Sequence, residues 1–336
     1  MTPRQRLQCM FSGKLPDDRL AMIEWAMWWD KTVEQWEEEG LPKGLSKTEL
    51  YDYFGLDRNY QHWMQHMTKE MPKPATHGAP RLSTQAEYDD YRKRGILLPD
   101  CIESIKADLE ETARRQERGE ITWFTFDGFF WYPRILLGIE EHLYSFYDEP
   151  EFYHHMCEDL AEWQLNMIEK LVTIVKPDFM TFAEDMSYNN GPMLSEDCFN
   201  EFLKPYYQKV IPVLKKHGIK VIVDSDGDIA KMVPWLIDAG IEGILPLERQ
   251  AGVDLEKLRA RYPKLLFMGH YDKMVMPKGE EAMRAEFERL LPVMKQGGFS
   301  LSVDHQTPPG VSLENYKIYL KLFREYAERA AAEFGE

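Results

Sequence analysis

Asp224, Asp226 and Asp228 stand at alternate positions where the apolar run KVIVDSDGDI (220–229) ends. Alternate residues of an extended chain point to the same side, so Asp224 and Asp226 are expected to share one face. Carboxylates held that close repel one another, which raises their pKa values or recruits a positive partner. Asp228 has a simpler interpretation as the N-cap of the segment that follows. The Asp224–Asp226 pair is therefore the first candidate for a functional site.

Five other apolar runs also end in or next to ionisable residues. These runs are ITWFTFD (121–127), PDFMTFAED (177–185), IEGILPLE (241–248), KLLFMGH (264–270) and FSLSVDH (299–305). The side chains at their ends are Asp127, Glu184, Asp185, Glu248, His270, Asp272, Asp304 and His305. Parallel strands of a barrel bring their carboxyl ends to one face, where barrel enzymes carry their active sites. We therefore expect these residues to surround a single opening.

Amphipathic stretches of helical length separate the apolar runs. Alternation of strand and helix predicts a parallel sheet, and its period is close to that of a (β/α)8 TIM barrel. No GxGxxG follows a strand, which disfavours the alternative of a doubly wound open sheet. A capping pattern at Ser195 predicts the start of a helix that ends near Gly218, and a long closing helix is predicted after Val311.

The N-terminal third has a different texture from the rest. Residues 1–120 contain amphipathic, charge-rich segments separated by loops, and we predict a mostly helical lid region with one or two strands. The clearest barrel portion is predicted over 121–336. No low-complexity linker divides the two, so the chain is predicted to be a single domain over 1–336.

The composition limits the classes of partner. A formal net charge of -16 argues against nucleic acid and anionic membranes. No apolar run approaches the length of a membrane span and the first residues do not resemble a signal peptide, so a cytoplasmic protein is expected. The four cysteines lack metal-like spacing, which is typical of packing residues in a reducing compartment. A homodimer is compatible with the sequence.

Tryptophans cluster near the N-terminus. Trp25, Trp28, Trp29 and Trp36 have the spacing of one helical face. They form either an aromatic core or an apolar, π-rich lid over a small organic substrate. Phe129, Trp131 and Tyr188, with the polar Asp127 and Glu248, are further candidates for the wall of the same site.

From about Thr122 onward the chain resembles the uroporphyrinogen decarboxylase superfamily. The segments that carry the resemblance include FAEDMSYNNGPMLSEDCFNEFLKPYYQKVIPVLKKHG, VDSDGDIAKMVPWLIDAGIEGILPLE, LLFMGHYDKMVM and GGFSLSVDHQTPPGVSLENYKIYL. The resemblance implies a (β/α)8 fold. It also implies one of two activities, porphyrinogen decarboxylation or the transfer of methyl groups to or from corrinoid cofactors.

Two departures from the family pattern favour the methyltransferase branch. True uroporphyrinogen decarboxylases have an arginine-rich segment near the N-terminus, where this chain has DDRLAMIEWAMWWDKTVEQW, and no FSDI-type segment is present. A substrate with eight carboxylates needs such arginines. The corrinoid methyltransferases resemble the chain at a His-x-Cys zinc motif, whose place is taken here by Asp224-Ser225-Asp226, and their late cysteine falls close to His305.

The resemblance therefore predicts a divalent metal, most simply zinc, held by Asp224, Asp226 and His305. The metal would polarise a small O- or N-methylated compound while a separate corrinoid protein accepts the methyl group. Glu184, Asp185 and His270 are the predicted acid–base residues. Three alternatives stay open: metal-free decarboxylation of an unidentified acid, non-enzymatic binding of an aromatic or quaternary amine, and corrinoid-independent methyl transfer or hydrolysis.

Overall fold

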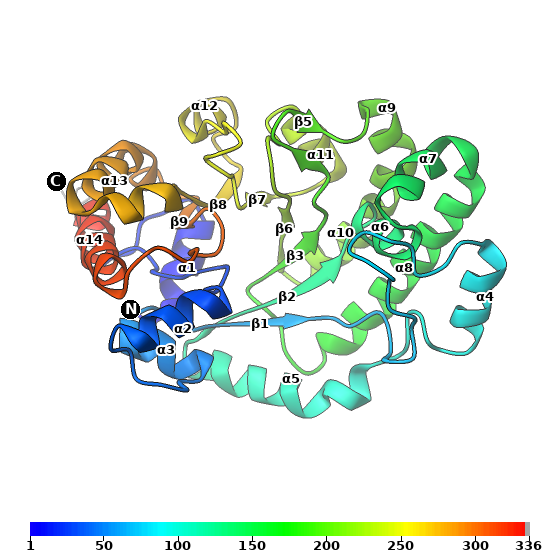
Figure 1. Ribbon diagram of the computed structural model, residues 1–336, viewed down its shortest axis with the longest axis horizontal. Helices are drawn as coiled ribbons and strands as arrows, with labels where there is room; N and C mark the ends of the chain where they lie inside the picture. Colours follow the sequence, from blue (N-terminus) through cyan, green and yellow to red (C-terminus); the bar gives the residue numbers. More distant parts are fainter. Residues whose placement is uncertain (333–336) are drawn as a thin grey trace.

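A curled parallel sheet forms the centre of the molecule, as a computed structural model that describes residues 1–332 shows (Figure 1). Its seven strands follow one another in the order β1-β2-β3-β6-β7-β8-β9. They are β1 (Asn59–Trp63), β2 (Ile121–Asp127), β3 (Phe179–Ala183), β6 (Lys220–Asp224), β7 (Gly243–Leu245), β8 (Leu266–Tyr271) and β9 (Phe299–Val303). All six pairings are parallel. The predicted barrel-type α/β fold is confirmed, and the six apolar runs are strands β2, β3 and β6 to β9.

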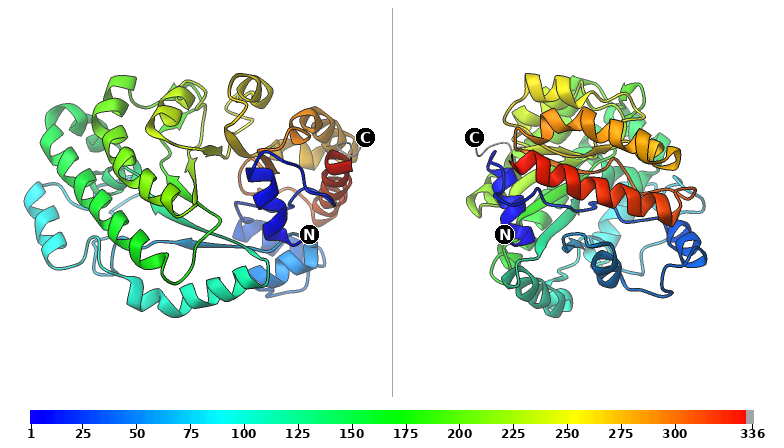
Figure 2. Two further views of the ribbon diagram at one scale, coloured as in Figure 1. Left: turned by 180° about the vertical axis from the view of Figure 1, so that it is seen from behind. Right: turned by 90° about the vertical axis from the view of Figure 1, so that its left-hand side faces the viewer.

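Helices cover the outside of the sheet, and Figure 2 shows the curled sheet and these helices from behind and from one side. Their bounds are α1 (Pro3–Phe11), α2 (Asp30–Glu38), α3 (Lys47–Phe54), α4 (Gln85–Lys93), α5 (Ile102–Glu117), α6 (Trp131–Leu137), α7 (Ile139–Asp148), α8 (Pro150–Leu171), α9 (Glu196–Cys198), η1 (Phe199–Leu203), α10 (Lys204–Lys216), α11 (Val233–Ala239), α12 (Leu255–Arg261), η2 (Lys273–Lys278), α13 (Glu280–Met294) and α14 (Leu313–Ala332). A short hairpin, β4 (Ser187–Tyr188) with β5 (Gly191–Pro192), follows β3.

The predicted helix boundaries in the second half agree with the structure. The Ser195 hydroxyl accepts a hydrogen bond from the Cys198 amide, as the capping pattern predicts, and α10 ends just before Gly218, whose φ is +75°. Helix α14 is the predicted closing helix. Asp228 caps a turn and not a helix, because its side chain accepts from the amide of Ala230 while α11 begins only at Val233.

An irregular segment over residues 20–25 closes the gap between β9 and β1. The Met22 carbonyl accepts from the Asp57 amide beside β1, and the Trp25 amide donates to the Ser302 hydroxyl on β9. The buried Glu24 carboxylate between them accepts from Ser302 Oγ at 2.7 Å, from the Val303 amide at 3.2 Å and from Tyr319 Oη at 3.0 Å. The N-terminal third thus supplies both β1 and the segment that closes the barrel.

The prediction that Trp25, Trp28, Trp29 and Trp36 share one helical face is wrong. Residues 20–29 contain no helix, and α2 begins at Asp30, so only Trp36 is helical. The spacing misled because this segment follows the sheet edge, where its tertiary hydrogen bonds to β9 replace those of a helix. No helix within residues 1–332 is both long and apolar enough to cross a membrane.

Candidate active site

We call the face of the sheet at the carboxyl ends of its strands the mouth. Strand register places Asp127 of β2 beside Ala183 of β3, and Ala183 beside Asp224 of β6. Residues paired in a parallel sheet point to the same side. The Thr125 and Thr181 hydroxyls, two residues earlier on β2 and β3, meet at 2.7 Å on this side, whereas Phe126 packs on Trp163 of the outer helix α8. Asp127 and Asp224 therefore face the barrel interior, on the two sides of Ala183.

Three carboxyl groups gather where β3 and β6 end. They belong to Asp185, Asp224 and Asp226, each partly accessible. The Asp185 side chain accepts from the Asp226 amide at 3.4 Å. No hydrogen-bond donor contacts the Asp224 carboxyl group among the described residues. Asp185 adds to the rise in the pKa of both Asp224 and Asp226, as expected for carboxyl groups that lie near one another.

Burial and repulsion from neighbouring carboxylates raise the pKa values of all three carboxyl groups. Burial is the main cause in each case, and the pKa of Asp226 rises to about 7 because Asp185 and Glu248 add to the effect. His305 Nε2 lies 3.7 Å from Asp226 Oδ2, and burial lowers the pKa of this imidazole. The mouth therefore brings together His305 with the aspartates that the sequence singled out.

Lys273, which the sequence analysis missed, lies on the β8–β9 side of the mouth. Its ammonium group donates to Gln250 Oε1 at 2.9 Å and to Asp304 Oδ1 at 3.1 Å, and Glu248 Oε1 lies 3.9 Å away. Glu248 also accepts from the Gly227 amide at 2.9 Å, so this network fixes the loop that carries Asp226. A single lysine in a 3-10 helix has no sequence pattern that could have revealed it.

Asp127 belongs to a separate polar cluster at the ends of β1 and β2. Its carboxylate accepts from the Trp63 indole at 2.9 Å, and His66 Nδ1 lies 3.3 Å from its other oxygen. Burial raises the pKa of Asp127 and lowers that of His66. Asp127 is thus held in the wall of the mouth, in partnership with two residues of the N-terminal third that no local motif connects with it.

Glu184 faces away from the mouth. Its carboxylate accepts from the amides of Phe129 and Phe130 at 2.8 Å and of Trp131 at 3.0 Å, and from the Tyr207 hydroxyl. These amides form the start of α6, whose positive dipole end favours a carboxylate. A Cβ on Gly128 would lie 1.9 Å from Glu184 Oε1, so glycine is required there. The structure places this predicted acid where it anchors the start of α6.

Three other predicted site residues lie outside the open part of the mouth. His270 is fully buried against α13; Nδ1 donates to the Leu247 carbonyl at 2.8 Å and Nε2 faces Arg289 at 3.4 Å, and burial lowers its pKa to about 4. Phe129 packs on Phe182 and Tyr207 behind the sheet. The face of the Trp131 ring is covered by the Arg134 guanidinium at 4.9 Å.

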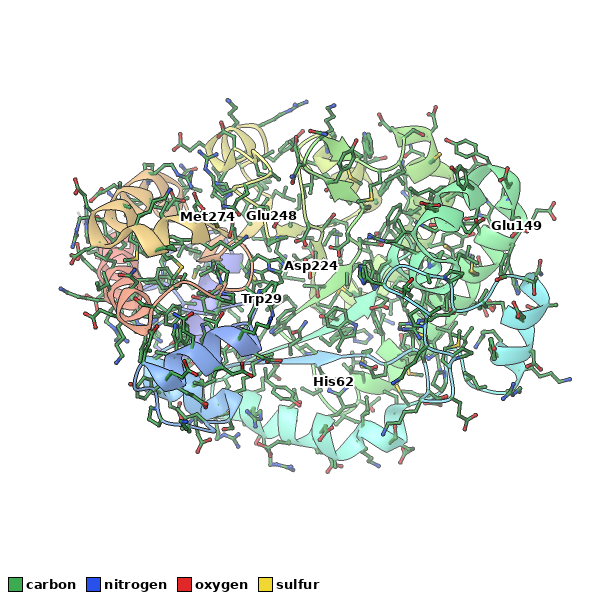
Figure 3. All side chains as sticks on the ribbon, viewed as in Figure 1. Trp29, His62, Glu149, Asp224, Glu248 and Met274 are labelled. Atoms are coloured by element: carbon green, nitrogen blue, oxygen red, sulfur yellow. The ribbon has the colours of Figure 1, made fainter. Side chains whose placement is uncertain are left out.

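The structure separates the three predicted N-terminal tryptophans. Trp28 is a core residue, packed on Trp36, Tyr51, Phe54 and Tyr316. Trp25 donates to the Val303 carbonyl at 2.9 Å and its ring meets that of His305 at 6.0 Å. Trp29 is 46% exposed and Tyr188 is 49% exposed. Figure 3 labels Trp29, Asp224 and Glu248 in the central part of the molecule.

The predicted metal ligands do not converge as a metal would require. Asp226 and His305 are neighbours, but no group of three His, Cys, Asp or Glu side chains within residues 1–332 is arranged to hold an ion. A closed or catalytic zinc site takes at least three protein ligands at about 2 Å from the ion. Asp224, Asp226 and His305 therefore do not fit a bound metal in the arrangement seen.

Hollows are also present at the opposite face. One of about 410 Å³ lies at the amino ends of β6 to β8, lined by Phe11, Ile237, Tyr262 and Leu266 among others. It contains none of the strand-end residues. In barrel enzymes this face contributes to stability and the carboxyl-end face to chemistry, so we retain the mouth as the candidate active site.

Comparisons with known proteins agree with this fold. A uroporphyrinogen decarboxylase from Rickettsia felis is 25% identical over 139 residues, which cover 41% of this chain and only 39% of that relative. A methyltransferase from Methanosarcina mazei superposes with a TM-score of 0.70 at 15% identity, covering 97% of this chain and 99% of the other, which shows a shared fold. The family model "Uroporphyrinogen decarboxylase (URO-D)" matches residues 135–326. The chain therefore belongs to the uroporphyrinogen decarboxylase (URO-D) family.

Proposed function

We propose that this chain is a methyltransferase that moves a methyl group from a small O- or N-methylated compound to a separate corrinoid protein. The observation that carries the proposal is the gathering of Asp185, Asp224 and Asp226 in the mouth with few protein donors. A methylated oxygen or nitrogen becomes a good leaving group when it carries positive charge. Carboxyl groups favour that charge, either by donating a proton or by attracting a donor that is already a cation.

The permanent cations near these acids do not suit a polyanionic porphyrinogen. Lys273 already bonds Asp304 and Gln250, and Arg134 donates to the Asp185 carbonyl at 3.0 Å while it covers Trp131. A substrate with many carboxylates would meet like charges without the bidentate guanidinium pairs that such a ligand needs. The structural similarity to a methyltransferase along nearly the whole chain supports the same choice.

In this proposal the corrinoid supplies the nucleophile, and the chain supplies binding, orientation and charge. The bond from the methyl carbon to oxygen or nitrogen breaks, and its electron pair stays on the leaving group. Asp226, 3.7 Å from His305 and on a loop fixed by Glu248, is positioned to act on that atom. Asp185 and Asp224 add negative charge beside it.

Decarboxylation is the second candidate, favoured by the same protonatable aspartates, since a carbanion left by carbon dioxide needs a proton. One assay separates the two. The protein is incubated with reduced free cobalamin and a panel of methyl ethers, methylamines and carboxylic acids. We expect the absorbance change of cobalt methylation with a methyl donor and no carbon dioxide. Carbon dioxide release from an acid, independent of cobalamin, would favour decarboxylation and contradict the proposal.

A further inference from the structure

The mouth contains more acidic than basic side chains. Apart from Asp127 and its partners, five carboxyl groups line it within residues 1–332, those of Asp185, Asp224, Asp226, Glu248 and Asp304, and the permanent cations Lys273 and Arg134 accompany them. Lys273 lies 3.1 Å from Asp304, which is its nearest carboxylate. Arg134 bonds a main-chain carbonyl.

The acids nearest the centre also lack hydrogen-bond donors. The Asp224 carboxyl group has none among residues 1–332, and the basic side chain nearest to Asp226 is the His305 imidazole at 3.7 Å, beyond hydrogen-bond distance. Asp185 has one weak donor, the Asp226 amide at 3.4 Å. Buried carboxylates are normally paired. The arrangement is complementary to a positive group that enters from outside.

The spacing suits an organic cation better than a metal ion. A metal draws three or more ligands into direct contact, which the described side chains do not do. An alkylammonium group is wider, and it is held by surrounding carboxylates and by the faces of aromatic rings. Trp25 is fixed by its bond to Val303 beside His305, and Trp29 is exposed. The neighbouring Trp131 already carries a guanidinium on its ring.

We infer that the methyl donor is a permanently charged N-methylated ammonium compound, bound between the Asp185–Asp224–Asp226 group and the Trp25 ring. The inference rests on the proposed function and narrows its substrate class. When the carbon–nitrogen bond breaks, the electron pair stays on nitrogen and the tertiary amine leaves neutral, so no proton donor is needed. The carboxylates then act on binding, and their loss should raise KM more than it lowers kcat.

The test compares two probes of the same shape. Binding of choline and of its neutral carbon isostere, 3,3-dimethylbutan-1-ol, is measured by calorimetry on the full chain. Choline is expected to bind at least about tenfold more tightly than the isostere. Asp224→Asn and Trp25→Leu should each reduce this preference, whereas Asp197→Asn, which removes the same charge from an exposed position on α9, should leave it unchanged.

Equal affinity for the two probes, including failure of choline to bind better than the isostere at millimolar concentration, overturns the inference. A preference retained in Asp224→Asn and Trp25→Leu, with circular dichroism showing both folded, places the cation elsewhere and overturns it too. The proposed function is judged separately. Methylation of cobalamin from neutral methoxybenzene by the wild-type chain would keep methyl transfer and overturn the cationic donor.

Discussion

Buried acids occupy two kinds of place in this molecule, the wall of the barrel and its mouth. In the wall, Glu24 accepts three hydrogen bonds and Glu184 accepts four. In the mouth, Asp224 and Asp226 have no such donors in the described structure, although burial raises the pKa of Glu24, Glu184 and Asp226 alike to about 7. Carboxyl groups with raised pKa values thus have different roles in the two places.

The number of hydrogen-bond donors around an acid separates structural acids from candidate functional acids in this chain. An acid whose oxygens are all satisfied by main-chain amides and tyrosine hydroxyls fixes the elements that donate to it. An acid left without donors costs stability unless a ligand pairs with it, and such strain is typical of functional sites. Glu184 and Asp185 are adjacent in sequence and fall on opposite sides of this division.

The largest expected effect follows from substitution in the wall. Glu184→Ala leaves three amides at the start of α6, two of them buried, without an acceptor, and should lower the free energy of unfolding by about 3 kcal/mol. Asp185→Asn is the matched neighbour. The φ of Asp185 is +44°, which asparagine also adopts readily, so the free energy of unfolding of Asp185→Asn should change by less than about 0.5 kcal/mol. Chemical denaturation of both variants is the measurement, and equal losses would erase the division between wall and mouth.

A smaller loss of stability is expected at Glu24, in the irregular segment over residues 20–25 between β9 and β1. Tyr319→Phe removes one donor from Glu24, while Ser302 and Val303 keep theirs, so the loss should be about 1 kcal/mol. The control is Tyr147→Phe on α7, since the Tyr147 side chain is 74% exposed. An unchanged free energy of unfolding in Tyr319→Phe would show that the hydrogen bond from Tyr319 does not stabilise Glu24.

The mouth should show the opposite sign of stability change. The pKa of Asp226 is raised from its ordinary value to about 7 in the folded chain, so its charge costs stability as pH rises through that interval. Asp226→Asn should therefore be more stable than wild type at about pH 8, by about 1 kcal/mol after allowance for a side chain that is 37% exposed, and equal to it near pH 4. Denaturation at both pH values tests this. A destabilised variant at the higher pH would place Asp226 among the wall acids.

The metal content of the purified protein distinguishes a zinc site in the mouth from a site for a cationic substrate. The sequence predicts zinc at Asp224, Asp226 and His305, and a cationic substrate makes that ion unnecessary. Mass-spectrometric analysis of the purified chain, after zinc supplementation, is expected to show well under one equivalent. About one equivalent, lost in His305→Ala, would support the metal and contradict the cationic donor.

The strands were predictable because each apolar run has a local pattern. The gathering of Asp185, Asp224, Asp226 and Glu248 was predictable because parallel strands share one exit face, but that rule did not place Glu184 and His270 correctly. The outward turn of Glu184 also follows from parity, since Ala183 and Asp185 flank it. Other features depend on contacts distant in sequence. Residues 20–29 are held by hydrogen bonds to β9 and α14, so the helical spacing of the tryptophans gave a wrong prediction. Trp63 and His66 meet Asp127, and Lys273 meets Asp304, only in the folded chain.

The most direct test of the central claim is cobalamin methylation by wild type, Asp226→Asn and Asp197→Asn side by side, with an N-methylated ammonium donor. The account predicts methyl transfer by wild type and Asp197→Asn, and a loss of kcat/KM of at least about a hundredfold in Asp226→Asn, with its fold intact. Methyl transfer at the wild-type rate by folded Asp226→Asn would contradict the assignment of the chemistry to the mouth.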